Sequence, residues 1–387
     1  MKLLVYATTF GADLLSFTRY AQQEHGDQVK VILKGADRFR SEGIVAHWNL
    51  DLDLIEKKRA HLFRGVKGFE PDITLIDNNL PMSRLSPKAL ILWHGYGWKG
   101  PNDVEEFRWL HRNLKYTWGS IREPNPDLWW NCFGPIDNEH RTKVSGIHPE
   151  NAVQFGAVSH DDLRVQVPVE SLQPYYPFDV TGRKTVLIAP TWHYGEVFSH
   201  WGGDKSSFQR LLDELQHQQC NVILRLHDSF RFEPSYLSYL SSLEKRYQHL
   251  MLKFKDHHPD NFLDMQVADL LITNYSSIAN LFYATGKPTL HIYPVKDADE
   301  AFMWKQKTLL GVKERRVDSA RFIWKYDPEE HGGLMARSMD ELMDQLEQAL
   351  AEPGITRMQA TRFLDRHMGG VDGKNGERLR EALEAWC

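Results

Sequence analysis

Cysteine is scarce in this sequence of 387 residues, and its three cysteines, Cys132, Cys220 and Cys387, lie far apart without a CxxC pair. An odd number of widely separated cysteines argues against a disulfide framework and against a thiolate zinc site. Because disulfides are rare in reducing compartments, this pattern favours a cytoplasmic protein.

Long hydrophobic runs are missing as well. A membrane-spanning helix needs about 20 mostly apolar residues in succession, and no segment of this chain provides them. The apolar start, MKLLVYA, meets Thr8, Thr9 and Gly11 within a few residues. It therefore predicts a buried first strand rather than a signal peptide. Contact with a membrane surface, at the inner face of the plasma membrane, stays open.

Basic tracts and two common catalytic motifs are also absent. The formal net charge is −5 and the pI is near 6.4, with Lys and Arg scattered along the chain. Proteins that bind the phosphate backbone need a concentrated basic surface, so we expect no nucleic-acid partner. Neither GxxxxGK[ST] nor GxSxG occurs in a usable context, which leaves a P-loop kinase and an α/β-hydrolase without support.

The sequence does contain a regular alternation of short apolar runs and longer helical patterns. Its hydrophobic fraction of 42% and charged fraction of 26% are those of a folded globular protein. Apolar runs predict strands at KLLVYA, QVKVILK, DITLIDN, ALILWHG and VQFGAV in the first half, and at KTVLIAPTW, CNVILRLHD, DLLITNYSS and KPTLHIYPV in the second. Strands that alternate with helices form parallel sheets, so we predict an α/β fold with two Rossmann-like, doubly wound domains.

A segment rich in proline and aromatic residues, VPVESLQPYYPFDVTGRK, separates the two series. We therefore predict an N-terminal domain over residues 1–170 and a C-terminal domain over 182–350. Residues 351–387 have helical spacing, and whether these helices pack back on the first domain stays open. Doubly wound folds bind ligands at the carboxyl ends of their strands, so we expect the two domains to face a ligand across a cleft.

Two of the predicted strands run into polar loops. The segment LWHGYGWKG places His94 and Gly95 directly after an apolar run, and a histidine there can transfer a proton near neutral pH. A structural histidine in a turn is the alternative. The segment APTWHYG places Thr191 after another strand, where free backbone N–H groups and a hydroxyl suit an anion. The alternative there is a turn covered by Trp192.

A third strand ends in VILRLHDSF, with Arg225 and His227 two residues apart. Such side chains point to the same side of a strand, so both cations could bind one phosphate. Burying an unpaired arginine is costly, and an ion pair inside the fold is the alternative.

A cluster of hydrogen-bonding side chains, TNYSS, lies where a fourth strand meets a helix. We predict that Thr273 or Asn274 caps a helix that begins near Ser276. The N–H groups of its first turn and the hydroxyls of Ser276 and Ser277 would then bind an anion. A plain N-cap without a ligand is the alternative. The adjacent histidines of DHHPDNFLD lie in a charged loop, where such pairs are more often solvated than metal ligands, so we expect no metal site.

Taken in order, these segments resemble the CDP-glycerol glycerophosphotransferases of teichoic-acid and capsule synthesis, which have the GT-B architecture. LWHGYGWKG is similar to the family's Trp-His-Gly segment with a following Lys, FGAVSHDDL to its Gly-x-Pro-Arg-x-Asp segment, and IAPTW to its Ala-Pro-Thr-Trp strand end. LRLHD is similar to Arg-x-His-Pro, ITNYSS to Ile-Thr-Asp-Tyr-Ser-Ser, and DGKNGERL to Asp-Gly-Lys-x-x-Glu-Arg. The chain departs from the pattern at Asp228 instead of Pro, Asn274 instead of Asp, and His193 instead of Arg, which puts the donor in question.

The resemblance implies roles for single residues. His94, as the base for the acceptor hydroxyl, and His227 are implied to be catalytic. The implied donor- and phosphate-binding residues are Gly95, Thr191, Arg225, Thr273, Asn274, Ser276 and Ser277. The other implied cleft residues are Lys99, Trp192, His193, Asp161, Glu377 and Arg378. No metal and no cofactor is expected besides the nucleotide-activated donor.

The implied activity is transfer of glycerol phosphate from CDP-glycerol to a hydroxyl of a glycan, lipid-linked or polyol-phosphate acceptor, with release of CMP. One alternative is a GT-B glycosyltransferase that uses a nucleotide-sugar donor, or a related nucleotide-sugar epimerase. Another is a non-catalytic protein that keeps only the nucleotide site. The acceptor, the oligomeric state and any peripheral membrane association stay open.

Overall fold

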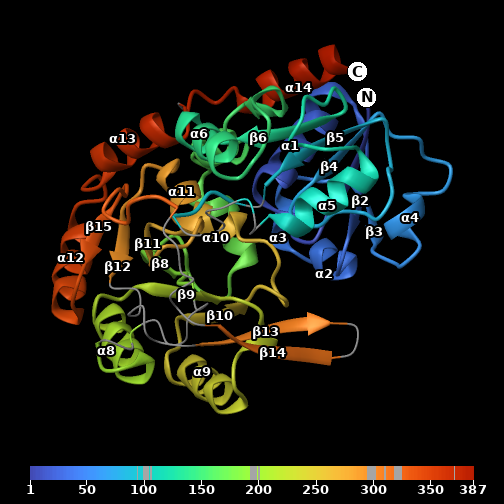
Figure 1. The fold of residues 1–387 in the computed structure, drawn as a ribbon. Coiled ribbons are helices and arrows are strands. Elements are labelled where there is room, and N and C mark those ends of the chain that lie inside the picture. The colour runs from blue at the N-terminus through green and yellow to red at the C-terminus, as the bar shows by residue number, and fades with distance from the viewer. Residues whose placement is uncertain are drawn as a thin grey trace. The chain divides into compact units, whose positions relative to one another are not determined.

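The computed structural model describes residues 1–93, 95–98, 104, 107–191, 198, 201–293, 302–308, 311–317, 325–369 and 371–387. The chain forms two compact units (Figure 1). Unit 1 comprises Met1–Tyr96, Pro101–Val165 and Arg362–Cys387, and unit 2 comprises Gly97–Gly100 and Gln166–Thr361. The division at residue 165 falls at the start of the segment that the sequence marks as a linker.

Unit 1 is built on a seven-stranded parallel sheet in the order β3-β2-β1-β4-β5-β6-β7. Its strands are β1 (Lys2–Ala7), β2 (Gln28–Leu33), β3 (Asp53–Glu56), β4 (Ile73–Ile76), β5 (Lys88–Leu92), β6 (Leu128–Cys132) and β7 (Ala152–Gln154). All four residues of β4 and all but the first of β1 are buried. Strands covered on both faces are apolar throughout, which is why they stand out as continuous runs in the sequence.

Six helices of the described chain connect these strands: α1 (Ala12–His25), α2 (Ala36–Arg40), α3 (Gly43–His47), α4 (His61–Arg64), α5 (Arg108–Thr117) and α6 (Pro135–Lys143). Helix α7 (Ser159–Leu163) follows β7. The C-terminal helix α14 (Asn375–Trp386) also lies on this unit. The carboxylate of Asp27 binds both the N-terminal ammonium of Met1 (2.5 Å) and Arg380 of α14 (2.6 Å). The two ends of the chain therefore meet at one edge of unit 1, as Figure 1 shows.

Unit 2 contains a six-stranded parallel sheet in the order β10-β9-β8-β11-β12-β15. Its strands are β8 (Thr185–Ile188), β9 (Asn221–Leu226), β10 (Leu250–Phe254), β11 (Leu270–Thr273), β12 (Thr289–Ile292) and β15 (Leu334–Ala336). The antiparallel pair β13 (Phe302–Thr308) and β14 (Gly311–Val317) also falls in this unit. Its helices are α8 (Asp204–His217), α9 (Pro234–Arg246), α10 (Phe262–Val267), α11 (Ile278–Tyr283) and α12 (Met339–Ala351), while α13 (Arg357–His367) runs from unit 2 into unit 1.

Helix α8 illustrates why the sequence folds as it does. Its buried residues Phe208, Leu211, Leu212 and Leu215 recur every three or four positions. This spacing places them on one face of a helix, where they join the core that covers β8 and β9. Among the helices of the described ranges, none combines the length and the apolar character that crossing a bilayer requires.

Both sheets reverse their strand order at one point, between β1 and β4 in unit 1 and between β8 and β11 in unit 2. This is the doubly wound α/β arrangement that the sequence predicts, and it is confirmed for each unit. Ligands of such sheets bind beyond the carboxyl ends of the strands at the reversal. The residues that follow β8, β9 and β11 are therefore the first place to look for a site.

Candidate functional site

The ends of β8 and β11 are joined by the side chain of Asn274. Its Oδ1 accepts a hydrogen bond from the backbone N–H of Thr191 (2.8 Å), and its Nδ2 donates to the Thr191 carbonyl (2.9 Å). The hydroxyl of Thr273 donates to the Ala189 carbonyl (2.8 Å). These bonds continue the β8–β11 ladder beyond the strands, so the prediction of a free N–H at Thr191 is wrong.

Helix α11 starts later than predicted. It begins at Ile278 after Ser277, whose side chain makes no capping hydrogen bond. The prediction that Thr273 or Asn274 caps this helix is therefore wrong, because both side chains are committed to β8 and its loop. Ser276 and Ser277 are half-buried, and neither hydroxyl is hydrogen-bonded within the described ranges. Two hydroxyls at this strand end thus remain available to a ligand.

Trp98 joins the LWHGYGWKG segment to the TNYSS segment inside unit 2. Its fully buried ring lies 6.0 Å from the ring of Tyr275 and 5.7 Å from that of His291, centroid to centroid. His291 in turn contacts the carbonyl of Asn274 through Nδ1 (2.9 Å), and burial lowers the pKa of His291 to about 3. Sequence reasoning missed Trp98, although the second tryptophan of the motif was a visible signal.

The end of β9 carries a histidine that an acid holds in place. The Nδ1 atom of His227 lies 3.0 Å from Oδ2 of Asp228 and accepts the backbone N–H of Asp228 (2.9 Å). Arg231 donates from Nε to the same carboxylate oxygen (3.0 Å). Burial lowers the pKa of His227, and the hydrogen bond to Asp228 opposes this effect. Asp228 is half-buried, and although its partial burial raises its pKa, the His227 hydrogen bond and the charges of His227, Lys255 and Arg231 hold that pKa well below its usual range.

The neighbouring strand β10 places a second polar loop beside this histidine. Asp256 accepts hydrogen bonds from the backbone N–H (2.8 Å) and the hydroxyl (2.7 Å) of Ser229. The ring of His257 lies near the same hydroxyl, 3.4 Å from Nε2 to Oγ. The carboxyl ends of β9 and β10 are therefore locked together by Ser229 and Asp256.

Arg225 does not offer a free cation to a ligand. Its guanidinium is buried and binds Oδ2 of Asp264 (3.1 Å) and the carbonyl of His258 (2.6 Å). Lys253 (2.6 Å) and the hydroxyl of Tyr176 (2.9 Å) both donate to Oδ1 of Asp264. This is the ion pair inside the fold that the sequence left as the alternative. The arrangement does not bring Arg225 and His227 together on one phosphate.

Asp161, Glu377 and Arg378 lie in unit 1 around the junction of α7 and α14. Asp161 accepts hydrogen bonds from the Asn375 side chain (3.0 Å) and from the backbone N–H of Gly376 (2.8 Å), and burial raises its pKa to about 6. Arg378 pairs with Asp372 (2.7 Å), and Glu377 is exposed. Gly95 is half-buried in the same unit, whereas His94, Lys99, Trp192 and His193 lie outside the described residues.

The strand reversal of unit 1 carries a polar group that sequence reasoning missed. Asp77 accepts hydrogen bonds from the backbone N–H groups of Thr8 and Thr9 (2.8 Å each). The ammonium of Lys57 lies 3.9 Å from the centre of the Tyr6 ring, and burial lowers the pKa of Lys57 to about 8. The Asp-Asn-Asn run directly after the predicted strand DITLI was the available signal.

The charged residues of the site do not gather into a metal-binding set. Within the part of the chain that the structure describes, no three His, Cys, Asp or Glu side chains converge as they would around a metal ion. The functional groups at the carboxyl ends of β8, β9 and β11 are therefore the His227 imidazole, which Asp228 binds, the hydroxyls of Ser276 and Ser277, and backbone groups. Such groups suit the binding and transfer of a phosphate ester.

The central part of the chain matches a known protein family. Residues 144–300 match the family model of CDP-glycerol:poly(glycerophosphate) glycerophosphotransferases. The resemblance noted in the sequence is confirmed over this segment. A search of curated proteins finds no match.

Solved structures with the same fold support the architecture. The wall teichoic acid polymerase TagF superposes with a TM-score of 0.67 at 14% identity, covering 99% of this chain and 88% of that one. The UDP-GlcNAc 2-epimerase of Neisseria meningitidis, bound to UDP-GlcNAc, gives 0.57 at 13% identity and covers both chains fully. MnaA of S. aureus with UDP gives 0.55 at 12% identity, covering 100% and 97%. At such identities these similarities establish a shared fold.

Proposed function

We propose that this transferase, whose residues 144–300 match the glycerophosphotransferase family, transfers glycerol phosphate from CDP-glycerol to a hydroxyl of a glycan or polyol-phosphate acceptor and releases CMP. The reaction would serve teichoic-acid or capsule polymer synthesis. The main support for this proposal is that the matched segment contains β8, β9 and β11. It also contains the polar residues described above that follow these strands. TagF, which shares the fold, has also been solved after a soak with CDPG.

The proposed reaction is an in-line displacement at the β-phosphorus of the donor. His94 accepts the proton of the acceptor hydroxyl, whose oxygen forms a new bond to phosphorus. The bond between this phosphorus and the oxygen shared with CMP breaks, and CMP leaves with the electron pair. Phosphoryl transfer depends mainly on positioning and on stabilising charge at the phosphate oxygens.

Unit 2 supplies hydrogen-bond donors for that charge. Asp228 orients the His227 ring through Nδ1, which fits a role for His227 at the donor phosphates. The hydroxyls of Ser276 and Ser277 are available at the neighbouring strand end. Arg225 would not contact the donor itself. Its bond to the His258 carbonyl (2.6 Å) would instead hold in place the loop that carries Asp256 and His257.

We further propose that a divalent metal ion is not essential for turnover. The proposal follows from the sequence, which offers no pair of acids with metal-binding spacing near the motifs. The test is to treat the enzyme with a chelator, remove it by gel filtration, and assay CMP release without and with added Mg²⁺ or Mn²⁺. Unchanged activity supports the proposal, and activity that returns only with metal overturns it.

A nucleotide-sugar donor is the second candidate. The full-length fold match to a UDP-GlcNAc 2-epimerase favours it, since that enzyme uses the same architecture for a UDP-sugar. The chain also carries Asp228, Asn274 and His193 where the glycerophosphotransferase pattern has Pro, Asp and Arg. Asp228 and Asn274 follow β9 and β11 of unit 2, where donor choice would be made.

Calorimetric titration of the full-length protein distinguishes the two donors. CDP-glycerol, CDP-ribitol, UDP-GlcNAc and CMP would be titrated under one set of conditions. The proposal expects CDP-glycerol to bind most tightly, with CMP weaker. A Ser276→Ala, Ser277→Ala double variant should lose affinity for CDP-glycerol. The matched control Ser238→Ala, Ser242→Ala, on α9, should bind as the wild type does. Binding of UDP-GlcNAc without binding of CDP-glycerol would reject the proposal in favour of the second candidate.

A further inference from the structure

Unit 2 has a cavity at the edge of its sheet where the neighbouring strands β10, β9 and β8 begin, and its volume is about 340 Å³. Arg183 lies two residues before β8, Cys220 directly before β9 and His249 directly before β10. The last turns of α8 and α9 complete the walls. Because the strands are parallel, His227 and Ser276 lie at the opposite, carboxyl edge. We call the cavity the amino-end pocket, and the polar residues that line it are Arg183, Gln216, Gln219, Arg246, Gln248 and His249.

The floor of the amino-end pocket is apolar and fixed. Leu212 of α8, Val222 of β9 and Leu250 of β10 line it, and all three are buried. The backbone N–H of Val222 donates to the His249 carbonyl (2.8 Å), and that of Leu250 donates to the Tyr247 carbonyl (3.1 Å). A preformed cavity of this size, with an apolar floor and a few polar groups on its rim, is typical of a site for a small molecule.

Two arginines face the pocket, and none of the described residues that line it is Asp or Glu. Arg246 pairs from outside the lining with Asp213 (3.5 Å), which also accepts a hydrogen bond from the Tyr247 hydroxyl (2.6 Å). Arg246 also lies in the last turn of α9, where a cation offsets the partial negative charge of the helix end. The position of Arg246 therefore has an explanation without a ligand.

Arg183 has no such explanation. It is half-buried, it lies outside the helices, and it forms no ion pair with the residues that the structure describes. Its charge acts on Asp179, but that carboxylate already accepts hydrogen bonds from Thr181 and Gly182. Two like charges at one small cavity repel each other, and a bound anion would remove this repulsion.

Three glutamines, Gln216, Gln219 and Gln248, add amide groups to the rim. None of these amides is hydrogen-bonded within the described part of the chain. Gln219 has a left-handed backbone (φ 55°) at the end of α8, a position that favours glycine. The chain keeps a side chain there despite this preference, and that side chain lines the pocket. An amide both donates and accepts, so it can bind a hydroxyl in either sense.

We propose that the amino-end pocket is a second binding site of this protein, for a small phosphate ester that carries hydroxyl groups. Guanidinium groups bind phosphate through paired hydrogen bonds, and a phosphate monoester offers enough oxygens for both Arg183 and Arg246. A carboxylate would be satisfied by one of the two. The glutamine amides bind the hydroxyls of the ester. The inference does not depend on the donor or on the reaction.

The test is calorimetric titration of the full-length protein with two esters. Glycerol 3-phosphate represents a free phosphate monoester, and glycerophosphoglycerol represents a phosphodiester within a polymer. Inorganic phosphate and glycerol are titrated as the separate parts, and we expect an ester to bind more tightly than either part. Tighter binding of the monoester would identify a soluble metabolite as the ligand, and tighter binding of the diester a polymer segment. Both results support the site.

Two variants locate the binding. Arg183→Gln should bind the ester about tenfold more weakly or worse, because it loses a charge-assisted contact. Gln219→Gly should weaken binding between about twofold and tenfold. Its unfolding temperature should not fall, because glycine suits the left-handed position. The matched controls are Arg357→Gln, an exposed arginine of unit 2, and Asn49→Gly, another left-handed residue (φ 49°), and both should bind as the wild type does.

Titration with CDP-glycerol separates this site from the proposed donor site. Arg183→Gln should bind CDP-glycerol as the wild type does, and the Ser276→Ala, Ser277→Ala variant should bind the ester as the wild type does. No binding of either ester to the wild type would overturn the proposal. Equal affinities of Arg183→Gln and Arg357→Gln would overturn it too, as would loss of ester binding in the serine variant alone.

Discussion

Asn274 stands where the family pattern has Asp, and its side chain makes two hydrogen bonds in this fold. An amide both donates and accepts, so Asn274 binds the N–H and the carbonyl of Thr191 at once. An ionised aspartate, the residue of the pattern, could accept from the N–H but would face the carbonyl with a second negative group. The substitution therefore strengthens the connection between β8 and β11 at the strand reversal.

Replacing Asn274 by Asp should lower the free energy of unfolding by about 1–3 kcal/mol at neutral pH, because a buried carbonyl loses its donor. Urea unfolding of both proteins measures the loss. At a pH low enough to protonate the new carboxyl group, the O–H can donate again and the difference should shrink. A variant as stable as the wild type at neutral pH would show that the amide is not needed here.

The pair of His227 and Asp228 leads to a prediction about pH. The carboxylate favours the protonated imidazole, so it raises the pKa of His227 against the lowering effect of burial. In an Asp228→Asn variant the pKa of His227 should therefore fall further, and the limb of the pH–rate profile that depends on protonated His227 should move to lower pH. Histidine NMR titration of the unliganded protein measures the pKa directly. Asp213→Asn, an exposed carboxylate on α8, is the control and should leave this pKa where it is.

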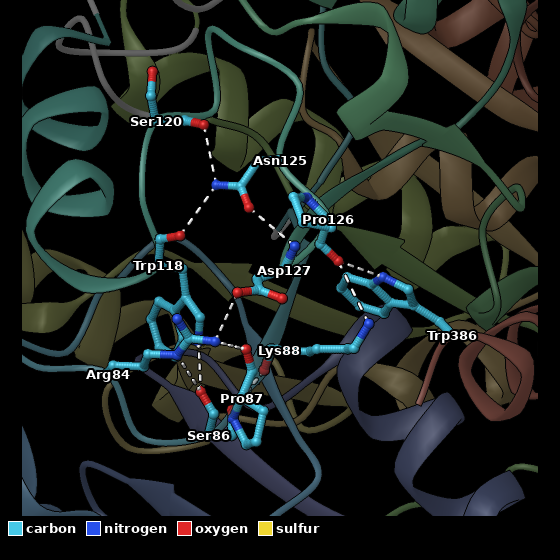
Figure 2. Close-up of polar contacts among 10 residues, drawn as sticks. All are labelled: Arg84, Ser86, Pro87, Lys88, Trp118, Ser120, Asn125, Pro126, Asp127 and Trp386. Carbon is cyan, nitrogen blue, oxygen red and sulfur yellow. Dashed lines mark hydrogen bonds and ion pairs between the residues drawn. The ribbon is translucent and has the colours of Figure 1, made fainter.

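At the scale of elements, helix α14 is fastened to unit 1 by its last aromatic residue. The Trp386 ring stacks on Trp129 with centroids 3.8 Å apart and planes 5° from parallel. Its Nε1 donates to the Pro126 carbonyl (2.7 Å), and the ammonium of Lys88 lies 4.7 Å from the ring (Figure 2). These contacts fix the C-terminal end of α14 against unit 1.

Trp386→Ala should lower the free energy of unfolding by about 1–3 kcal/mol, from the lost aromatic pair and the lost hydrogen bond. Trp386→Phe keeps a ring for stacking but loses the donor, so it should cost less than the alanine. Thermal or urea unfolding ranks the three proteins. If the phenylalanine variant were as unstable as the alanine variant, the hydrogen bond rather than the stacking would hold the helix.

The junction of α1 and α7 carries a buried acid that makes stability depend on pH. Oδ1 of Asp13 accepts hydrogen bonds from the backbone N–H (3.0 Å) and the hydroxyl (2.6 Å) of Ser159. Burial raises its pKa to about 6 from 3.8, so the folded state binds a proton more tightly than the unfolded state. This group therefore contributes stability below about pH 4, and the contribution is lost as the pH rises through 6.

Asp13→Asn keeps an oxygen for Ser159 and removes the charge. The variant should be more stable than the wild type at pH 7, by up to about 3 kcal/mol from the pKa difference, and the gap should close as the pH falls to 4. Urea unfolding at pH 7, 5.5 and 4 gives the two curves. A gap that stays constant across this range would show that the charge of Asp13 is not the cause.

Many of the strands could be predicted from the sequence, and the failures have physical causes. Every strand proposed from an apolar run is present, because strands covered on both faces must be apolar. The strands that were missed are β3, β6, β10, β13, β14 and β15. Of these, β3 is partly exposed at the sheet edge, β10 contains the buried Lys253, and β15 has only three residues. Strand β6, LWWNC, carries a polar Asn131 in a short run, and β13 and β14 are rich in charged residues. Local composition does not reveal a strand whose burial depends on distant neighbours.

At the candidate site, the sequence shows which strand ends are polar but not what each side chain binds. The partner of Arg225 is Asp264, 39 residues further along the chain, and no local pattern connects them. The start of α11 was placed too early because Asn274 looked like a cap, whereas it binds the loop after β8, 83 residues earlier. Hydrogen bonds across a sheet thus decide the roles of residues that look alike in sequence.

At the scale of the whole molecule, the proposed donor chemistry depends on the strand ends of unit 2. Replacing the exposed Phe63 and Tyr116 of unit 1 by serine should therefore leave donor binding in solution unchanged. The Ser276→Ala, Ser277→Ala variant should weaken it.

The most direct test of the central claim is the identity of the released nucleotide. The full-length enzyme would be incubated with CDP-glycerol, CDP-ribitol or UDP-GlcNAc and a polyol-phosphate acceptor, and the products followed by chromatography and phosphorus NMR. The account predicts CMP release from CDP-glycerol together with a new phosphodiester on the acceptor. Turnover of UDP-GlcNAc to UDP or to an epimer, with CDP-glycerol left intact, would contradict it.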